Sequence, residues 1–179
     1  MNFKKSVFAM LFGFSCVANA ATVENFVQLT MDEVQAQLAA KRSANVCTID
    51  FTGEVGPEQL GIGVNLKSNT VVVIGYMLEG NQALSPMFGA MSKANATEFA
   101  RQIKLVANSD VKELVDDEFF QYEYVSFNEV KVDVDKYATG EVYLGVQDDS
   151  SLVGGYAVDI NGSADMISGC VESATSYLK

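Results

Sequence analysis

The stretch Ser163–Leu178, SADMISGCVESATSYL, decides how the fold is closed. Its apolar residues recur at the three- and four-residue spacing of an amphipathic helix, with Asp165, Ser168 and Glu172 on the opposite, polar face. Ser163 is placed to cap the start of this helix. Cys170 lies in the middle of the apolar face, so we expect the helix to be fastened to the core through its sulfur.

Residues 1–20 have the pattern of a secretory signal peptide. They contain a basic start, an apolar run that is too short to cross a membrane, and the cleavage pattern Ala18-Asn19-Ala20. We predict cleavage after Ala20, a periplasmic or secreted location, and no membrane insertion of the remaining chain. A lipoprotein signal, the alternative, would need a Leu-like residue at Gly13, ahead of Cys16. Residues 21–179 are expected to form a single domain, because their length suffices for one core.

Loss of the signal peptide removes Cys16 and leaves Cys47 and Cys170. Two cysteines in an oxidising compartment predict one disulfide, Cys47–Cys170, with two buried free thiols as the alternative. The bond would close a loop of more than a hundred residues. The chain-entropy model gives such a loop about 4–5 kcal/mol of stabilisation.

The order of the other patterns predicts an α+β fold with a mostly antiparallel sheet in two strand blocks. Thr30 and Glu33 form a capping box that starts the first helix. The apolar run Val71–Ile74 predicts a strand covered on both faces, and Ser85-Pro86 predicts a helix start. In chain order, the sequence predicts a helix from 31 to 42, strands at 46–52, 60–66 and 70–77, helices at 85–93 and 95–108, strands at 119–124, 130–134, 141–147 and 152–160, and the closing helix.

The charge of the chain is negative and unevenly distributed. The sequence holds 12 basic and 23 acidic residues, for a net charge of −11. Residues 105–179 hold 15 of the acids and only four bases. This half is expected to repel nucleic acid and anionic lipid and to attract a cationic protein partner.

The chemistry available to the chain is narrow because it contains no histidine. This excludes Ser-His and Cys-His nucleophiles and the common zinc sites. Ser109 and Lys112 match a Ser-x-x-Lys pattern, but its companion motifs are missing. Asp133 with Asp135, or the pair Asp148-Asp149, could bind calcium only weakly. We therefore predict no enzyme activity, no cofactor and no metal, with a carboxylate-dependent hydrolase as the least favoured alternative.

Recognition of a partner is predicted between Asp110 and Asp135, where nine acids and two lysines alternate with aromatic residues. Aromatic rings supply contact area and acids steer a basic partner. In the alternative interpretation, the rings pack into the core and the acids only face water. The candidate contact residues are Asp116, Asp117, Glu118, Tyr122, Glu123 and Tyr124.

These observations predict a non-enzymatic exported binding protein of the bacterial envelope, for example an inhibitor or immunity protein that masks a cationic enzyme or toxin. The alternative is a periplasmic assembly factor or structural component that acts through a sheet edge or an apolar groove. The oligomeric state is left open by the sequence.

Overall fold

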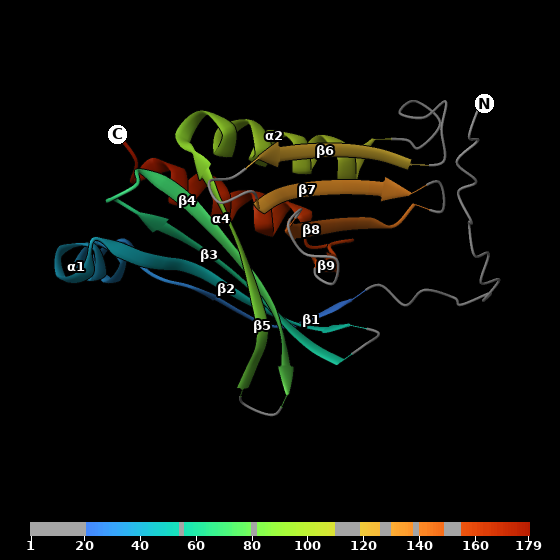
Figure 1. Cartoon of the computed structure of the whole chain (residues 1–179), viewed down its shortest axis with the longest axis horizontal. Coiled ribbons are helices and arrows are strands. Elements are labelled where there is room, and N and C mark those ends of the chain that lie inside the picture. The colour runs from blue at the N-terminus through green and yellow to red at the C-terminus, as the bar shows by residue number, and fades with distance from the viewer. Residues whose placement is uncertain are drawn as a thin grey trace, which may run out of the picture.

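The computed structural model describes residues 21–53, 56–79, 82–109, 119–125, 130–137, 140–148 and 155–179. Two antiparallel sheets are present, with the strand orders β1-β2-β3-β4-β5 and β6-β7-β8-β9 (Figure 1). This arrangement confirms the predicted α+β class. The elements are β1 (Thr22–Gln28), α1 (Met31–Lys41), β2 (Ser43–Gly53), β3 (Gly56–Asn65), β4 (Thr70–Glu79), β5 (Gln82–Ser92), α2 (Lys93–Asn108), β6 (Phe119–Val125), β7 (Val130–Tyr137), β8 (Val142–Asp148), β9 (Gly155–Asp159) and α4 (Ala164–Ser176).

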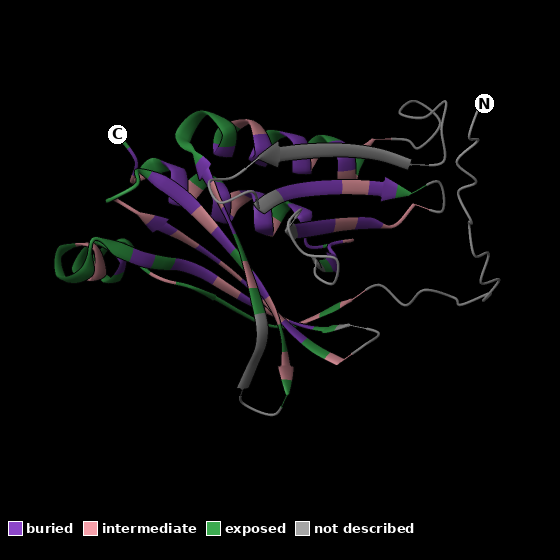
Figure 2. Ribbon diagram, in the orientation of Figure 1, coloured by how far each residue is buried: buried purple, intermediate pink, exposed green. Residues whose placement is uncertain are grey.

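The first sheet has one covered face, which we call the inner face. Helix α4 lies against β2, β3 and β4 on this face, and α2 lies beside α4 and contacts β5 (Figure 1). The second sheet packs through β7 and β8 against β5. Alternate residues of β3 and β4 are therefore buried, as Figure 2 shows. The core includes Ile49, Phe51, Leu60, Ile62, Val73, Phe99, Ile103, Leu144 and Ile167.

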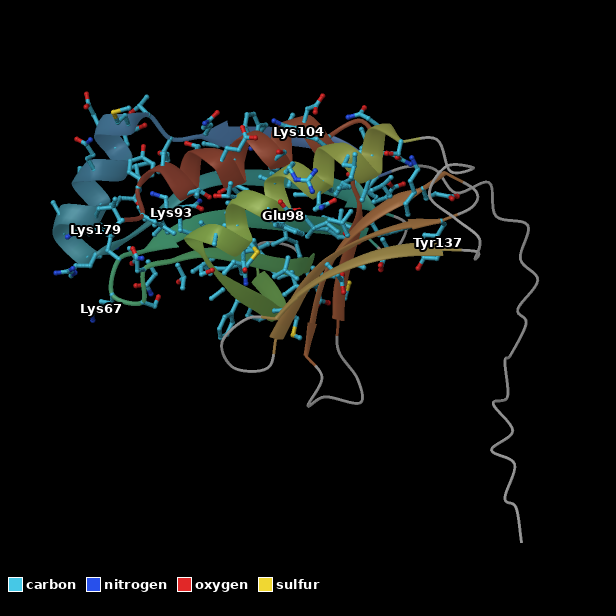
Figure 3. The ribbon with its side chains drawn as sticks, turned by 90° about the horizontal axis from the view of Figure 1, so that it is seen from above. Lys67, Lys93, Glu98, Lys104, Tyr137 and Lys179 are labelled. Carbon is cyan, nitrogen blue, oxygen red and sulfur yellow. A yellow bond between two sulfur atoms is a disulfide. The ribbon has the colours of Figure 1, made fainter. Side chains whose placement is uncertain are left out.

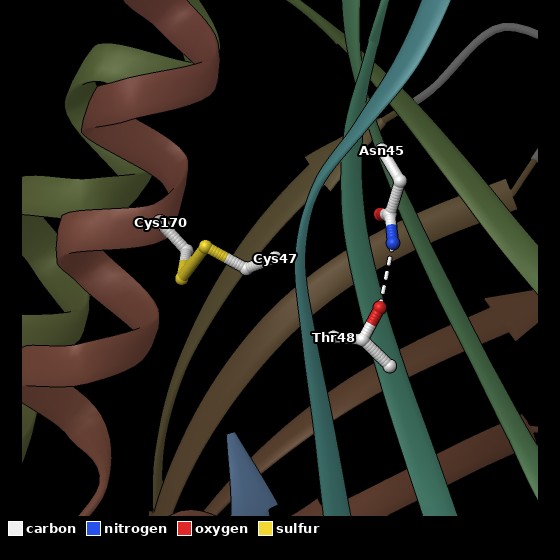
Figure 4. The surroundings of a disulfide bond; sticks show 4 residues. All are labelled: Asn45, Cys47, Thr48 and Cys170. Carbon is white, nitrogen blue, oxygen red and sulfur yellow. Dashed lines mark hydrogen bonds between the residues drawn. A yellow bond between two sulfur atoms is a disulfide. The ribbon is translucent and has the colours of Figure 1, made fainter. Parts of the chain in front are cut away.

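Cys47 of β2 and Cys170 of α4 form the predicted disulfide (Figure 4). Their Cα atoms are 5.9 Å apart, and 123 residues separate them in the sequence. Both cysteines are buried. The bond therefore joins the inner face of the first sheet to the last helix of the fold.

Helix α1 begins as the capping box predicts. The Thr30 backbone N–H donates to Glu33 Oε2 at 2.8 Å, and the Glu33 backbone N–H donates to Thr30 Oγ1 at 3.4 Å. The Thr30 hydroxyl also donates to Glu33 Oε2 at 2.7 Å. This bond, together with the one from the Thr30 backbone N–H, lowers the pKa of Glu33, since both favour its charged form. Val34 is the one buried residue of this helix, so α1 is attached at the end of the first sheet rather than within the core.

One residue on the predicted polar face of helix α4 is buried instead of exposed. Ser168 was expected on the polar face, but it is buried, and its hydroxyl donates to the Ala100 carbonyl of α2 at 2.7 Å. A small hydroxyl residue that finds a backbone acceptor fits between two close helices. Ser163 stands at the N-cap position, but its hydroxyl donates to the Ile160 carbonyl instead of accepting from the helix.

Helix α2 is closed at its C-terminal end by a lysine from the second sheet. Lys136 is buried on β7, and its Nζ donates to the carbonyls of Val106 at 3.0 Å and Ala107 at 3.2 Å. It also donates to the Ser109 carbonyl. A cation suits this helix end because the last carbonyls lack partners within the helix. The contact ties α2 to the second sheet.

Two predictions about the first sheet were wrong. Ser85-Pro86 does not start a helix, because residues 82–92 form β5 and complete the sheet against β4. The proline lies where the register between β4 and β5 shifts, and its missing N–H costs little at such an irregularity. The run Val71–Ile74 is covered on one face only, since Ile74 is 37% exposed. The sequence prediction also omitted β1, whose side chains are mostly exposed and carry no clear alternation.

The remaining sequence predictions have mixed outcomes. The strands predicted at 60–66 and 70–77 pair as β3 and β4, and Asn69 in the turn between them has the left-handed conformation at φ 55°. The helix predicted at 95–108 is present and buries Phe99, Ile103 and Val106, although it begins at Lys93 with Ser92 as its cap. Residues 111–115, where the sequence favours a further helical turn, and residues 126–129, where the alternation changes phase, lie outside the described residues. No helix in the described part of the chain is long and apolar enough to cross a membrane.

Glu58 of β3 points toward the inner face, in line with Leu60 and Ile62. It is 6% exposed, and its Oε2 has no hydrogen-bond partner among the described residues. Burial raises the pKa of this carboxyl group, because a charge is costly away from water.

Removal of the disulfide provides a first test of the fold. The double substitution Cys47→Ala, Cys170→Ala is expected to lower the free energy of unfolding by about 2–5 kcal/mol, because the long loop is no longer closed in the unfolded chain. Urea denaturation measures this change. Cys16→Ala is the control and should have no effect on the exported protein. Titration of two free thiols in the native protein would contradict the bond.

Glu58→Gln provides a second test, through pH. The folded pKa of Glu58 lies above its usual 4.5, so this group favours the folded state at low pH. That contribution is lost as the pH rises from about 4.5 through the folded pKa. The Gln variant should therefore gain stability relative to the wild type as the pH rises above about 4.5, as urea denaturation at each pH would show. The exposed change Glu24→Gln is the control. A stability difference that stays constant with pH would show that the carboxylate is not buried.

Candidate functional site

The face of the first sheet opposite α4, which we call the outer face, holds a groove of about 440 Å³. Its size lies within the range of small-ligand sites, roughly 300–1,000 Å³. Helix α1 contributes Gln37 and Lys41 to one side, and β2, β3 and β4 form the floor. The lining also includes Ser43, Ala44, Asn45, Thr48, Gln59, Gly61, Gly63, Val64, Asn65, Val72, Ile74 and Tyr76.

The amide groups at the α1 end of the groove are held by hydrogen bonds. The Asn45 backbone N–H donates to Gln37 Oε1 at 3.2 Å, which ties α1 to β2. Asn45 Nδ2 donates to Thr48 Oγ1 at 2.6 Å. Figure 4 shows this pair on the side of β2 that faces away from the disulfide. The polar groups of the groove are thus oriented before any ligand arrives, which lowers the entropy cost of binding.

A second group of polar side chains, around Asp50, lies on the outer face beyond the groove centre. Asp50 accepts from Asn25 Nδ2 at 3.1 Å and from Gln59 Nε2 at 2.5 Å. Tyr76 is the neighbour of Gln59 in the register of β3 and β4. Burial raises the pKa of Tyr76, and the Asp50 carboxylate raises it further. The phenol therefore stays protonated and can donate a hydrogen bond to a ligand at neutral pH.

The two glycines of the floor exist for different reasons. A Cβ on Gly63 would come within 2.6 Å of the Ala44 carbonyl oxygen, so packing of the backbone requires this glycine. A Cβ on Gly61 would meet nothing nearer than 3.8 Å, which is an ordinary contact. Glycine weakens the interior of a strand, and it often marks a place where a ligand approaches the backbone. Packing of the fold therefore does not require glycine at position 61. A groove floor that is open to a ligand does require it.

Apolar side chains continue the groove across the sheet. Val27, Thr48, Gly61, Ile74 and Phe88 occupy successive strands in one cross-strand row. The exposed fractions of Val27, Ile74 and Phe88 are 45%, 37% and 47%. A ligand on this face would therefore meet polar groups beside α1 and apolar surface toward β5.

The groove contains no acidic residue although the chain is strongly acidic. Residues 34–49 and 59–78 supply every side chain of the lining and contain no Asp or Glu, whereas the whole chain has 23. Lys41 is the one charged side chain among the lining residues. The α1 end of the groove is therefore positive, whereas the Asp50 carboxylate, which accepts from the lining residue Gln59, lies beyond the groove centre.

None of the residues that line this groove is a contact residue predicted from the sequence. Asp116, Asp117 and Glu118 lie outside the described residues. Tyr122, Glu123 and Tyr124 belong to β6, where their backbones pair with Val134, Asp133 and Val132 of β7. The structure describes this pairing but not the orientation of the β6 side chains, so the acidic contact surface stays a prediction.

Sequence reasoning missed the groove. Gly61 and Gly63 are visible in the sequence, but such a pair by itself indicates no more than a strand weakened by glycine. Asp133 and Asp135 lie on β7, where Asp133 is buried and Asp135 is half-buried. In the part of the chain that the structure describes, no three His, Cys, Asp or Glu residues gather as a metal site.

Comparisons with protein-family models, with curated proteins and with solved structures give no match for this chain. The function therefore has to be argued from the groove itself.

The two floor glycines can be separated by mutation. Gly61→Ala should raise the free energy of unfolding by about 0.5–1 kcal/mol, because alanine has less freedom to lose and meets no clash. Gly63→Ala should lower it by roughly 1–3 kcal/mol, because the Ala44 carbonyl cannot easily move. Urea denaturation of both variants measures these changes. Equal destabilisation by the two alanines would mean that the fold requires both glycines.

Proposed function

We propose that the protein is a non-enzymatic, exported binding protein and that the groove on the outer face of its first sheet is the ligand site. Export is supported by the signal-like residues 1–20 and by the disulfide, which suits an oxidising compartment. The absence of histidine from the sequence supports a role in binding rather than in catalysis.

Gly61 carries the proposal. It occupies the centre of a strand in the middle of the sheet, where glycine costs stability and where a larger residue would fit. This loss of stability can be explained by function, because a ligand can reach the backbone of β3 where the groove floor has no side chain at position 61. The oriented amides of Gln37 and Asn45 support the same conclusion.

The proposed masking of a cationic enzyme or toxin by Asp116, Asp117 and Glu118 belongs to the same class of function but uses another surface. It is supported by the acidic composition of residues 105–179. A protein that uses both surfaces would hold one ligand in the groove and one protein at the acidic segment.

An assembly factor is the second candidate, and the edge of the first sheet favours it. Strand β1 is the edge strand of that sheet, with Phe26 37% and Val27 45% exposed. Such an edge can accept a strand from another polypeptide. Because this edge does not involve Gly61, a substitution at Gly61 separates the two candidates.

Binding to a mixed library of oligosaccharides and extended peptides tests the proposal. Gly61→Val places a side chain in the groove, since a Cβ at this position makes only ordinary contacts and a β-branched residue suits a strand. We expect library members to bind the wild type and to bind Gly61→Val at least about tenfold more weakly, a loss of about 1.4 kcal/mol. Affinities are measured by calorimetry.

Gly169→Ala is the matched control, because a Cβ on this glycine of α4 meets nothing within 4 Å. It should bind like the wild type. If every ligand binds Gly61→Val as tightly as the wild type, the groove is not the site, and the β1 edge or the acidic segment becomes the better candidate. If no library member binds the wild type, the proposed function is wrong for both ligand classes.

A further inference from the structure

We infer that the ligand of the groove is an acidic oligosaccharide, bound with its carboxylate at the α1 end. This inference rests on the proposed function and names the chemical class of the ligand. Two independent features carry it. One is a cluster of cations beside the groove, and the other is the hydrogen-bonding chemistry of the lining.

The cations of the described residues are unevenly distributed. Arg101 and Lys104 form ion pairs with Glu98 and Glu172, and Lys136 is buried. Five exposed cations form no ion pair within the described part of the chain. One of them, Lys93, donates to the Leu178 carbonyl at 2.8 Å, and we call the other four the basic end. The basic end consists of Lys41, Arg42, Lys67 and Lys179.

Hydrogen bonds bring the segments of the basic end together. The Leu66 backbone N–H donates to the Arg42 carbonyl at 2.8 Å, which joins the turn carrying Lys67 to the start of β2. The Lys179 backbone N–H donates to Asn69 Oδ1 at 3.2 Å. Figure 3 shows Lys67 and Lys179 at the same end of the molecule as α1. The basic end is therefore one surface.

This surface is continuous with the groove. Lys41 belongs to the lining, and so do Ser43 and Asn65, which are paired partners in β2 and β3. Ser43 follows Arg42, and Asn65 lies two residues before Lys67. A ligand in the groove would thus extend toward several cations, in a protein whose net charge is −11. An anionic group on the ligand gains charge-assisted hydrogen bonds there.

The lining itself suits hydroxyl groups. Beyond their bonds within the protein, Gln37, Asn45 and Gln59 still offer an amide donor and an acceptor, and Asn65 offers its amide N–H groups. Thr48, Ser43 and Tyr76 add hydroxyls. A sugar hydroxyl also both donates and accepts, so such side chains can satisfy it fully. Val72 and Ile74 supply apolar contact for the faces of the sugar rings.

Other anionic or extended ligands fit less well. The backbone groups of β3 are already used in pairing with β2 and β4, so an extended peptide cannot add as a strand on this face. Tyr76 is the one aromatic residue of the lining, whereas single-stranded nucleic acid stacks its bases on several rings. The net charge of −11 also opposes a chain that carries one phosphate per nucleotide.

A matched pair of probes tests this inference. Cellobiouronic acid and cellobiose have the same ring framework, but only the first carries a carboxylate. We expect the full exported chain to bind cellobiouronic acid at least about tenfold more tightly than cellobiose, because the carboxylate gains a charge-assisted contact. Lys41→Gln should remove this preference, and Lys104→Gln, which changes a lysine of an ion pair elsewhere, should preserve it. Calorimetry at low and high salt measures the affinities.

The outcomes separate this inference from the proposed function. If a neutral peptide or an oligothymidylate binds in a Gly61-dependent manner and neither sugar does, the groove is a binding site but its ligand class is wrong. Equal binding of the two sugars would show that the basic end plays no part. If the sugars bind Gly61→Val as tightly as the wild type, both the inference and the groove site are wrong. Absence of sugar binding to the wild type also overturns the inference.

Discussion

The disulfide between Cys47 and Cys170 fixes which face of the first sheet is buried. Side chains alternate along a strand, so an inward Cys47 places Ile49 and Phe51 inward and Thr48 outward. The antiparallel register then extends this choice across the neighbouring strands. A shift of one residue would exchange the two faces, and both the buried apolar residues of the strands and the bond to α4 oppose it. The groove lies on the opposite face, the one that the disulfide does not reach.

The two faces of the sheet consequently have different chemistry. The inner face meets two helices and the second sheet, and it is closed by apolar side chains of the core. Among the described residues, helix α1 covers one end of the outer face, where Gln37 accepts a hydrogen bond from the Asn45 backbone. Polar side chains can stay on this face because their partners are each other, as with Asp50 and Gln59. A preorganised polar surface beside a rigid core is a common basis for selective binding.

Local signals in the sequence predicted the elements that local interactions decide. The capping box of α1, the helical period of α4 and the pairing of the two remaining cysteines were all visible in the sequence. The strand β5 was missed because Ser85-Pro86 resembles a helix start, and only pairing with β4 overrides that signal. The groove was missed because its residues come from α1, β2, β3 and β4 and meet only through the register. An apolar run such as Val71–Ile74 shows that a strand is buried but not on how many faces.

The net charge of the chain and the charge of its groove lead to opposite expectations about the ligand. The total of −11 predicts a cationic partner, whereas residues 34–49 and 59–78, which line the groove, contain no acid and include Lys41, Arg42 and Lys67. Ions screen exposed charges over about 10 Å at 0.1 M salt, so the local set dominates once a ligand is seated. The acidic remainder acts at longer range and opposes dense polyanions. The local cations and the acidic remainder of the chain together favour a ligand that carries few negative charges and reaches the groove itself. A sparsely charged saccharide meets this condition better than a nucleic acid does.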